Sequence, residues 1–312
     1  MSAARYHVVH ETTYRYESPV SLSRQLLHLT PRECPWQSCF EHVITIDPAP
    51  GIETRRLDSF GNPIRQFAIE SPHTSLVVRS ESRIEVRARP HAPIFGSPSW
   101  ESVRDALAYG ALPVRLDAAA CLFESPYVRA KREFEAYAAP SFTPGRPLLD
   151  AVRDLMTRIY GEFAYDPAAT TVATPVLQIL EDKRGVCQDF AHLMLSCLRS
   201  MGLAARYVSG YLLTQPPPGQ PRLVGADASH AWIAVYCPAA HGGNEGNDGD
   251  WVDFDPTNNQ LPGTRHITVA WGRDFGDVSP LRGVILGGDS HRPEVAVTVA
   301  PCEGPEEPAS AG

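Results

Sequence analysis

The sequence has no CxxC pair, no run of basic residues and no apolar run long enough to cross a membrane. Its seven cysteines are scattered without a repeated spacing, which is unlike the ligand patterns of zinc ribbons and thioredoxin-like redox sites. No apolar stretch approaches the roughly 20 residues of a membrane-spanning helix, and the N-terminus lacks the apolar core of a signal peptide. We therefore expect no membrane partner, a cytoplasmic location and free thiols.

Charge is sparse and mixed in sign. The chain carries 28 basic and 36 acidic side chains, for a formal net charge of −8. A nucleic-acid-binding surface needs clustered lysine and arginine, so we expect no nucleic-acid partner. No calcium loop of the DxDxDG type occurs, and no metal or other cofactor is predicted. Apolar residues make up 43% of the 312 positions, enough for packed domains.

The pattern of apolar residues divides the chain into four parts. Residues 1–95 alternate polar and apolar side chains, as in "RYHVVHETTYRYE" and "SLVVRSESRIEVRA", which predicts an all-β, sandwich-like domain. A proline-rich stretch then opens a connector with helical segments, residues 96–145. Residues 146–300 form the expected catalytic domain. The tail, residues 301–312, has few bulky apolar groups and is expected to be disordered.

Helices and strands are both predicted within residues 146–300. Apolar side chains recur at three- and four-residue spacing from Leu148 and again after Cys187, where Gly202 ends the second helix. The segments "ARYVSGYLL", "SHAWIAVY" and "WVDFDPT" then read as strands. The order of helices followed by an antiparallel sheet predicts an α+β fold.

Three polar residues stand out in this layout: Cys187 opens a helix, His230 begins a strand, and Asp255 ends the next strand. A helix N-terminus favours a thiolate, and a thiol, an imidazole and a carboxylate are the parts of a nucleophilic triad. A hairpin would bring His230 opposite Asp255. Each residue also has a packing or turn interpretation, and Asp253 competes with Asp255 because strand alternation points both to one face.

Several long motifs resemble the bacterial transglutaminase-like cysteine proteases, a branch of the papain-like superfamily. They are "RGVCQDFAHLMLSCLRSMGLAARYVSGYL", "DASHAWIAVY" and "WVDFDPTNNQ". The resemblance implies a papain-like transglutaminase core, in which a helix carrying the cysteine packs on an antiparallel sheet. It assigns the triad to Cys187, His230 and Asp255, which favours Asp255 over Asp253. "HETTYRYESPVSLSRQLLHLTPR" and "DSFGNP" are similar to the β-rich N-terminal domain of this branch, and "HITVAWGRDFGDVSPLRGVILGG" to its C-terminal extension.

Other site residues are less clearly indicated. In the superfamily an upstream side chain contributes to the oxyanion hole, for which Tyr165 is a candidate, and Gln188 offers at least a backbone N–H. Trp232 and Asp253 are candidates for the substrate cleft, although Trp232 is expected to pack beside His230. A metal site formed by His230, Asp253 or Asp255, and His241 is an alternative, but its ligand spacing is a poor match to known sites.

The predicted reaction is acyl transfer from an amide through a thioester of Cys187. Resolution by water would make the protein a cysteine peptidase or amidase, which the resemblance favours. Resolution by an amine would make it a protein-glutamine transglutaminase. A non-catalytic peptide-binding module is the alternative of another class. The expected partner is a peptide or protein amide, and the oligomeric state stays open.

Overall fold

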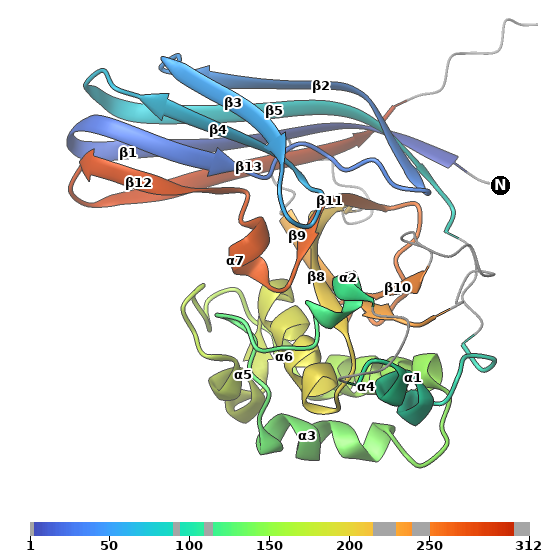
Figure 1. The fold of residues 1–312 in the computed structure, drawn as a ribbon. Coiled ribbons are helices and arrows are strands. Elements are labelled where there is room, and N and C mark those ends of the chain that lie inside the picture. Colours follow the sequence, from blue (N-terminus) through green and yellow to red (C-terminus); the bar gives the residue numbers. More distant parts are fainter. Residues whose placement is uncertain (1–2, 90–93, 109–114, 215–228, 239–249, 303–312) are drawn as a thin grey trace, which may run out of the picture.

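The computed structural model describes residues 3–89, 94–108, 115–214, 229–238 and 250–302 of the chain. Figure 1 shows a large curled β-sheet lying over a smaller sheet, with the main helices gathered beneath the smaller sheet. The fold is therefore α+β, as the alternating and helical patterns of the sequence predicted.

The large sheet is built around one long strand, β1 (Ala3–Leu27). The first half of β1 pairs with β5 (His73–Arg87) and β13 (His291–Pro301). Its second half pairs with β4 (Pro63–Ile69) and β12 (Leu281–Gly287). All of these pairings are antiparallel, so β1 is the common strand of two four-stranded halves.

The two halves curl toward each other around the middle of β1. The register of β1 shifts between Arg15 and Val20, and a shift of this kind bends a strand and increases its twist. β2 (Gln37–Asp47) extends one half beyond β5, and β3 (Ile52–Leu57) extends the other beyond β4. An apolar cluster fills the curl and contains Tyr16, Val20, Leu27, Leu29, Phe67, Ile69, Leu76 and Val78. The predicted sandwich-like region is thus one continuous sheet folded over its own core.

The last two strands lie in this sheet, although the predicted catalytic domain of residues 146–300 would have included them. β12 and β13 pair with β1, and Val297 and Val299 of β13 are fully buried there. Pairing between strands so far apart in the chain leaves no trace in local periodicity. Of the predicted tail, Pro301 ends β13 and the N–H of Cys302 donates to the carbonyl of Arg5 at 2.8 Å; residues 303–312 lie outside the described residues.

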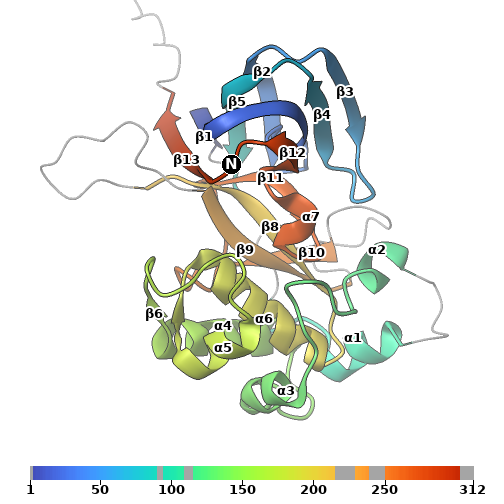
Figure 2. The same cartoon turned by 90° about the vertical axis from the view of Figure 1, so that its left-hand side faces the viewer.

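The smaller sheet has the strand order β10-β9-β8-β11, with antiparallel neighbours throughout. Its strands are β8 (Ala205–Leu212), β9 (Ser229–Tyr236), β10 (Trp251–Phe254) and β11 (His266–Gly272). Almost all of their residues are buried, because the large sheet lies on one side and helices on the other (Figure 2).

One helix, α6 (Cys187–Ser200), forms the centre of the helical layer. Apolar side chains cover most of its circumference, as expected of a helix that is buried on every side. It packs against β8 and β9 and against α3 (Arg132–Ala138), α4 (Leu148–Glu162) and α5 (Val176–Asp182). The shorter helices are α1 (Trp100–Ala106), α2 (Leu116–Ala119), η1 (Ala139–Ser141) and α7 (Phe275–Val278). Among the described residues, no helix has the length and apolar character needed to span a membrane.

Candidate active site

Cys187 is the first residue of the buried helix α6, and the segment before it holds it there. Short β7 (Arg184–Gly185) pairs in parallel with β6 (Ala164–Tyr165). The carboxylate of Asp189 then accepts the backbone N–H of Val186 at 2.9 Å and the hydroxyl of Thr170 at 2.7 Å. A Cβ on Gly185 would lie 2.7 Å from this carboxylate, so the close turn requires glycine. The thiol is half-buried at the end of the helix.

His230 and Asp255 come together from the other side of the site. His230 is near the start of β9, and its Nε2 lies 2.8 Å from Oδ2 of Asp255. The two residues are not directly opposite in a ladder, which corrects the expectation from the hairpin: the pairing of β10 with β9 ends at Phe254 and Ile233. Asp255 instead reaches His230 from a turn that is closed by its backbone pairing with Gln260.

The electrostatics of this pair differ from those of ordinary side chains. Burial alone would lower the pKa of His230, but hydrogen bonds to Asp255 and Cys187, together with their charges, raise it to about 10. Burial would raise the pKa of Asp255, but hydrogen bonds from His230 and His266 hold it below its usual range. The effect of Cys187 on the pKa of His230 indicates that the thiol faces the ring. Because Nε2 is bonded to Asp255, Nδ1 is the ring nitrogen left for the sulfur.

Asp255 is held by a dense set of donors, although it is fully buried. Its Oδ1 accepts the backbone N–H groups of Thr257 at 3.0 Å and Asn258 at 3.3 Å. Its Oδ2 accepts the side-chain amide of Asn258 at 2.8 Å in addition to His230. A buried carboxylate is tolerated only when its oxygens are paired in this way, so the "DPTN" turn fixes the charge where His230 meets it.

A second histidine completes the cluster, and no motif of the sequence pointed to it. His266 begins β11, and its Nε2 lies 3.1 Å from the same Oδ2 of Asp255. His266 is the first residue of "HITVAWGRDFGDVSPLRGVILGG", which the sequence related only to the C-terminal extension of the family. A single histidine in an alternating segment gives no signal of a partner 11 residues upstream.

The two residues predicted for the substrate cleft are buried instead. Trp232 has no exposed surface, and its indole N–H donates to Oδ2 of Asp253 at 2.9 Å. Asp253 also pairs with Arg89. Trp232 lies beside the His230 ring with 5.9 Å between the ring centroids, which is the packing interpretation of its position. Alternation along β10 therefore does not put Asp253 beside Asp255 at the site.

The two candidates for the oxyanion hole lie near the sulfur. Tyr165 pairs with Gly185, two residues before Cys187, and 57% of its surface is exposed. Burial first, and then the charge of Cys187, raise the pKa of its phenol, so the thiol and the phenol are close enough to interact. Gln188 is half-buried in the first turn of α6, where backbone N–H groups have no partner within the helix.

The ligand atoms of His230, Asp255 and His266 lie within 4.8 Å of one another, a spacing that a metal ion could bridge. In this structure each histidine instead makes a hydrogen bond to the shared carboxylate oxygen, at 2.8 and 3.1 Å. His241, the third ligand of the predicted alternative, lies outside the described residues.

Family models match both parts of the chain. Residues 6–85 match the bacterial transglutaminase-like N-terminal region, and residues 135–256 match the transglutaminase-like superfamily. The first match covers most of the strands of the large sheet that precede the helices. The second covers Cys187, His230 and Asp255.

Similar proteins are known from several bacteria. The uncharacterized protein Rv2569c of Mycobacterium tuberculosis is 44% identical over 306 residues, covering 96% of this chain and 94% of that protein. The uncharacterized protein ML0607 of Mycobacterium leprae is 33% identical over 301 residues, covering 95% and 98%. A crystal structure from Cytophaga hutchinsonii, provisionally described as a cysteine protease, has a TM-score of 0.72 at 18% identity and covers 97% of this chain and 92% of its own. At this identity the last likeness bears on the fold alone.

Proposed function

The chain belongs to the transglutaminase-like superfamily, and from this premise we propose that it is a thiol acyl-transfer enzyme with the triad Cys187, His230 and Asp255. One observation carries the proposal. The ring of His230 is hydrogen-bonded at one nitrogen to the buried carboxylate of Asp255, and Cys187, through its hydrogen bond and its charge, also raises the pKa of the same ring. A structural histidine has no need of both partners.

The proposed first step is attack on an amide. The sulfur of Cys187 forms a bond to the carbonyl carbon of a peptide or protein amide, and the carbonyl oxygen takes the negative charge. Backbone N–H groups in the first turn of α6, including that of Gln188, and the phenol of Tyr165 are the candidates to stabilise that oxygen. When the C–N bond breaks, the His230 imidazolium gives its proton to the leaving nitrogen, and a thioester remains.

The second step returns the enzyme to its starting state. His230, now neutral, takes a proton from water as the water oxygen attacks the thioester carbon. The C–S bond breaks, the product leaves as a carboxylic acid, and the sulfur is again paired with the imidazolium. Asp255 keeps the ring oriented and stabilises its positive charge in both steps. We therefore propose a cysteine peptidase or amidase.

Reactivity of the thiol tests the triad directly. Iodoacetate is an anion that is attracted to an imidazolium beside a thiolate, so we expect Cys187 to be alkylated much faster than other cysteines at pH 7. Cys39 is the internal control, because burial and the charge of Glu33 raise its pKa to about 11. His230→Ala should abolish the difference. Equal rates at Cys187 and Cys39 in the unmodified protein would reject the triad.

The class of reaction needs a separate experiment. The protein is incubated with casein, with and without a fluorescent primary amine, beside its Cys187→Ala variant. Cleaved fragments that depend on Cys187 support a peptidase, whereas incorporated fluorescence supports a protein-glutamine transglutaminase. If neither product forms although Cys187 is reactive, the enzyme acts on a narrower set of amides. Neither product with an unreactive Cys187 would favour a peptide-binding module.

A further inference from the structure

β11, the strand that carries His266, is the edge strand of the smaller sheet. Among the residues that the structure describes, its one strand neighbour is β8 in the sheet order, so the backbone groups on its other side need different partners. Buried backbone N–H and C=O groups are almost always paired. In this structure two side-chain amides from the large β-rich region provide partners for this edge.

Gln37, at the start of β2, pairs with the middle of β11. Its Oε1 accepts the N–H of Thr268 at 2.8 Å, and its Nε2 donates to the carbonyl of the same residue at 2.7 Å. The amide thereby makes the two bonds that the opposite residue of an antiparallel neighbouring strand would make. Gln37 is fully buried, so solvent cannot replace these bonds.

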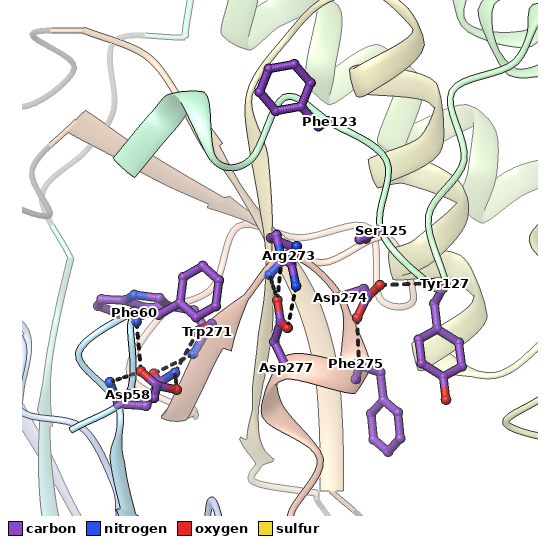
Figure 3. A network of polar contacts seen from close by, with 12 residues as sticks. Asp58, Phe60, Phe123, Ser125, Tyr127, Trp271, Arg273, Asp274, Phe275 and Asp277 are labelled. Carbon is purple, nitrogen blue, oxygen red and sulfur yellow. Dashed lines mark hydrogen bonds and ion pairs between the residues drawn. The ribbon is translucent and has the colours of Figure 1, made fainter. Parts of the chain in front are cut away.

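Asn62 makes the same pair of bonds at the far end of β11. Its Oδ1 accepts the N–H of Trp271 at 3.0 Å, and its Nδ2 donates to the Trp271 carbonyl at 2.8 Å. Asp58 holds the turn that presents Asn62, because its carboxylate accepts the N–H groups of Phe60 and Asn62, both at 2.8 Å. Figure 3 shows Asp58 and Phe60 beside Trp271, with Arg273 and Asp277 paired nearby. Both amides therefore come from positions that are themselves held by the β-rich region.

The near end of β11 reaches the candidate active site through His266. Its Nε2 donates to Oδ2 of Asp255 at 3.1 Å, and the N–H of Gly263 points to its Nδ1 at 3.4 Å. The Gly263 contact assigns the ring proton to Nε2, on the side of Asp255. Trp232 fixes the plane of the ring by an edge-to-face contact, with 5.3 Å between centroids and 82° between planes.

We propose that His266 is a positioning residue that holds the carboxylate of Asp255 against His230, and that the β-rich region supports it by clamping β11 through Gln37 and Asn62. The inference rests on the proposed function, because it assigns Asp255 to the triad. It gives the β-rich region a task in catalysis, one that needs no contact with the substrate.

The two histidines on Asp255 have different charge states. Burial, opposed by the hydrogen bond and charge of Asp255 and aided by the charges of His230 and Arg89, lowers the pKa of His266. His266 is therefore neutral where His230 is protonated, and it donates to Asp255 without competing for the proton. A neutral donor can orient the carboxylate and still leave its charge to the imidazolium.

Substitution of His266 tests the positioning role through the alkylation of Cys187 by iodoacetate. We expect His266→Leu to lower the rate by about ten-fold, the lower end of the cost of losing an orienting partner at a metal site. At alkaline pH the alkylation rate should fall as the His230 imidazolium loses its proton, and we call this fall the alkaline limb of the pH profile. In His266→Leu the limb should move to lower pH, because Asp255 would no longer be held against the imidazolium. His266→Gln, whose amide can donate from nearly the same point, should keep most of the rate and the position of the limb.

His42 in β2 is the matched control, because its two ring nitrogens lie 3.0 Å from the hydroxyls of Thr30 and Ser82, away from the site. His42→Leu should lower stability without moving the limb. An unmoved limb in His266→Leu, or equal losses in the Leu and Gln variants of His266, would overturn the positioning role. Circular dichroism and thermal unfolding establish that each variant is folded.

A double-mutant cycle tests the clamp. Gln37→Leu removes both bonds to Thr268, and we expect it to slow alkylation and move the limb in the same direction as His266→Leu. If Gln37 acts through His266, the double variant should be no slower than His266→Leu alone. If the double variant is slower by the product of the two single reductions in rate, the clamp is overturned. Failure of the proposed function gives a different result, since Cys187 would then be unreactive in the unmodified protein.

Discussion

In the register of β8 and β9, Gly210 lies directly opposite His230. A Cβ on Gly210 would overlap the carbonyl oxygen of Ile267 and lie 2.6 Å from the ring of Trp232. The strand beside the histidine therefore has room only for a hydrogen at this position. The restriction is one of space, because the Ile267 carbonyl of β11 and the Trp232 indole already occupy the position that a Cβ would take.

Gly210→Ala should therefore destabilise the protein by about 3 kcal/mol, the upper part of the usual range for overpacking, because a backbone atom cannot give way easily. Gly161 in α4 is the control: a Cβ there meets nothing within 4 Å, and alanine favours the helix by up to about 1 kcal/mol. Urea unfolding measures both changes. Equal unfolding free energies for the two variants would contradict the packing around His230.

The raised pKa of His230 predicts an alkaline limit for the reaction of Cys187 with iodoacetate. With the folded-state pKa raised to about 10, the imidazolium should persist through neutral pH and lose its proton as the pH rises through about 10. The contribution of the His230 imidazolium to stability depends on pH in the same direction. It is fully present below the unfolded pKa of 6.5 and is lost as the pH rises toward about 10. Alkylation rates across the neutral and alkaline range measure the limb. A limb near the unfolded value would mean that Asp255 gives the ring no support.

Asp255 and Asp253 form a matched pair of carboxylates two residues apart. Asp255→Asn removes the charge that supports the imidazolium, so turnover of an amide substrate, once one is identified, should fall by about 100-fold or more, and the alkaline limb should move to lower pH. Asp253→Asn removes the partner of Arg89 and Trp232 and should lower stability while leaving the limb in place. A shift of the limb in the Asp253 variant would mean that Asp253, and not Asp255, supports the imidazolium.

His10 should make stability depend on pH below neutrality. It is buried between Tyr211 and Thr12, and burial lowers its pKa from 6.5 to about 4. Between these two values the unfolded chain binds a proton at His10 that the folded chain does not, so stability should rise with pH across that window. His10→Asn, whose amide can still form a hydrogen bond with Tyr211, should reduce that slope in urea unfolding measured at several pH values. An unchanged slope would mean that a group other than His10 causes the loss of stability at lower pH.

Local sequence patterns were sufficient to predict the classes of element but not their long-range pairing. Alternation in "RYHVVHETTYRYE" predicted a strand because one face of β1 is buried, and apolar spacing after Cys187 predicted the central helix because α6 is buried. The membership of β12 and β13 in the large sheet could not be predicted in this way. The alternation of polar and apolar residues in these strands predicts that one face is covered. It does not predict which strand lies beside them.

The candidate site shows the same division. The motifs around Cys187, His230 and Asp255 named residues at the ends of elements, because Cys187 opens α6, His230 lies near the start of β9 and Asp255 follows the end of β10. His266, Gln37 and Asn62 had no such signal, because a histidine or an amide that serves a distant backbone or carboxylate looks like any other polar residue. "DSFGNP", which contains Asn62, indicated only a likeness to the β-rich domain. Alternation also misled for Asp253, because the chain leaves the ladder after Phe254 and turns Asp255 toward His230.

The pairing of β1 with β12 and β13 has a consequence for the order in which the protein is made. The first strand to be synthesised has to wait for the last two, with the whole helical layer and the small sheet produced in between. Until then one side of β1 is open in each half of the sheet. The β-rich half of the molecule is thus completed only after its neighbour, and a ribosome that stops short of β12 would release a chain whose hydrogen-bonding edge invites other strands.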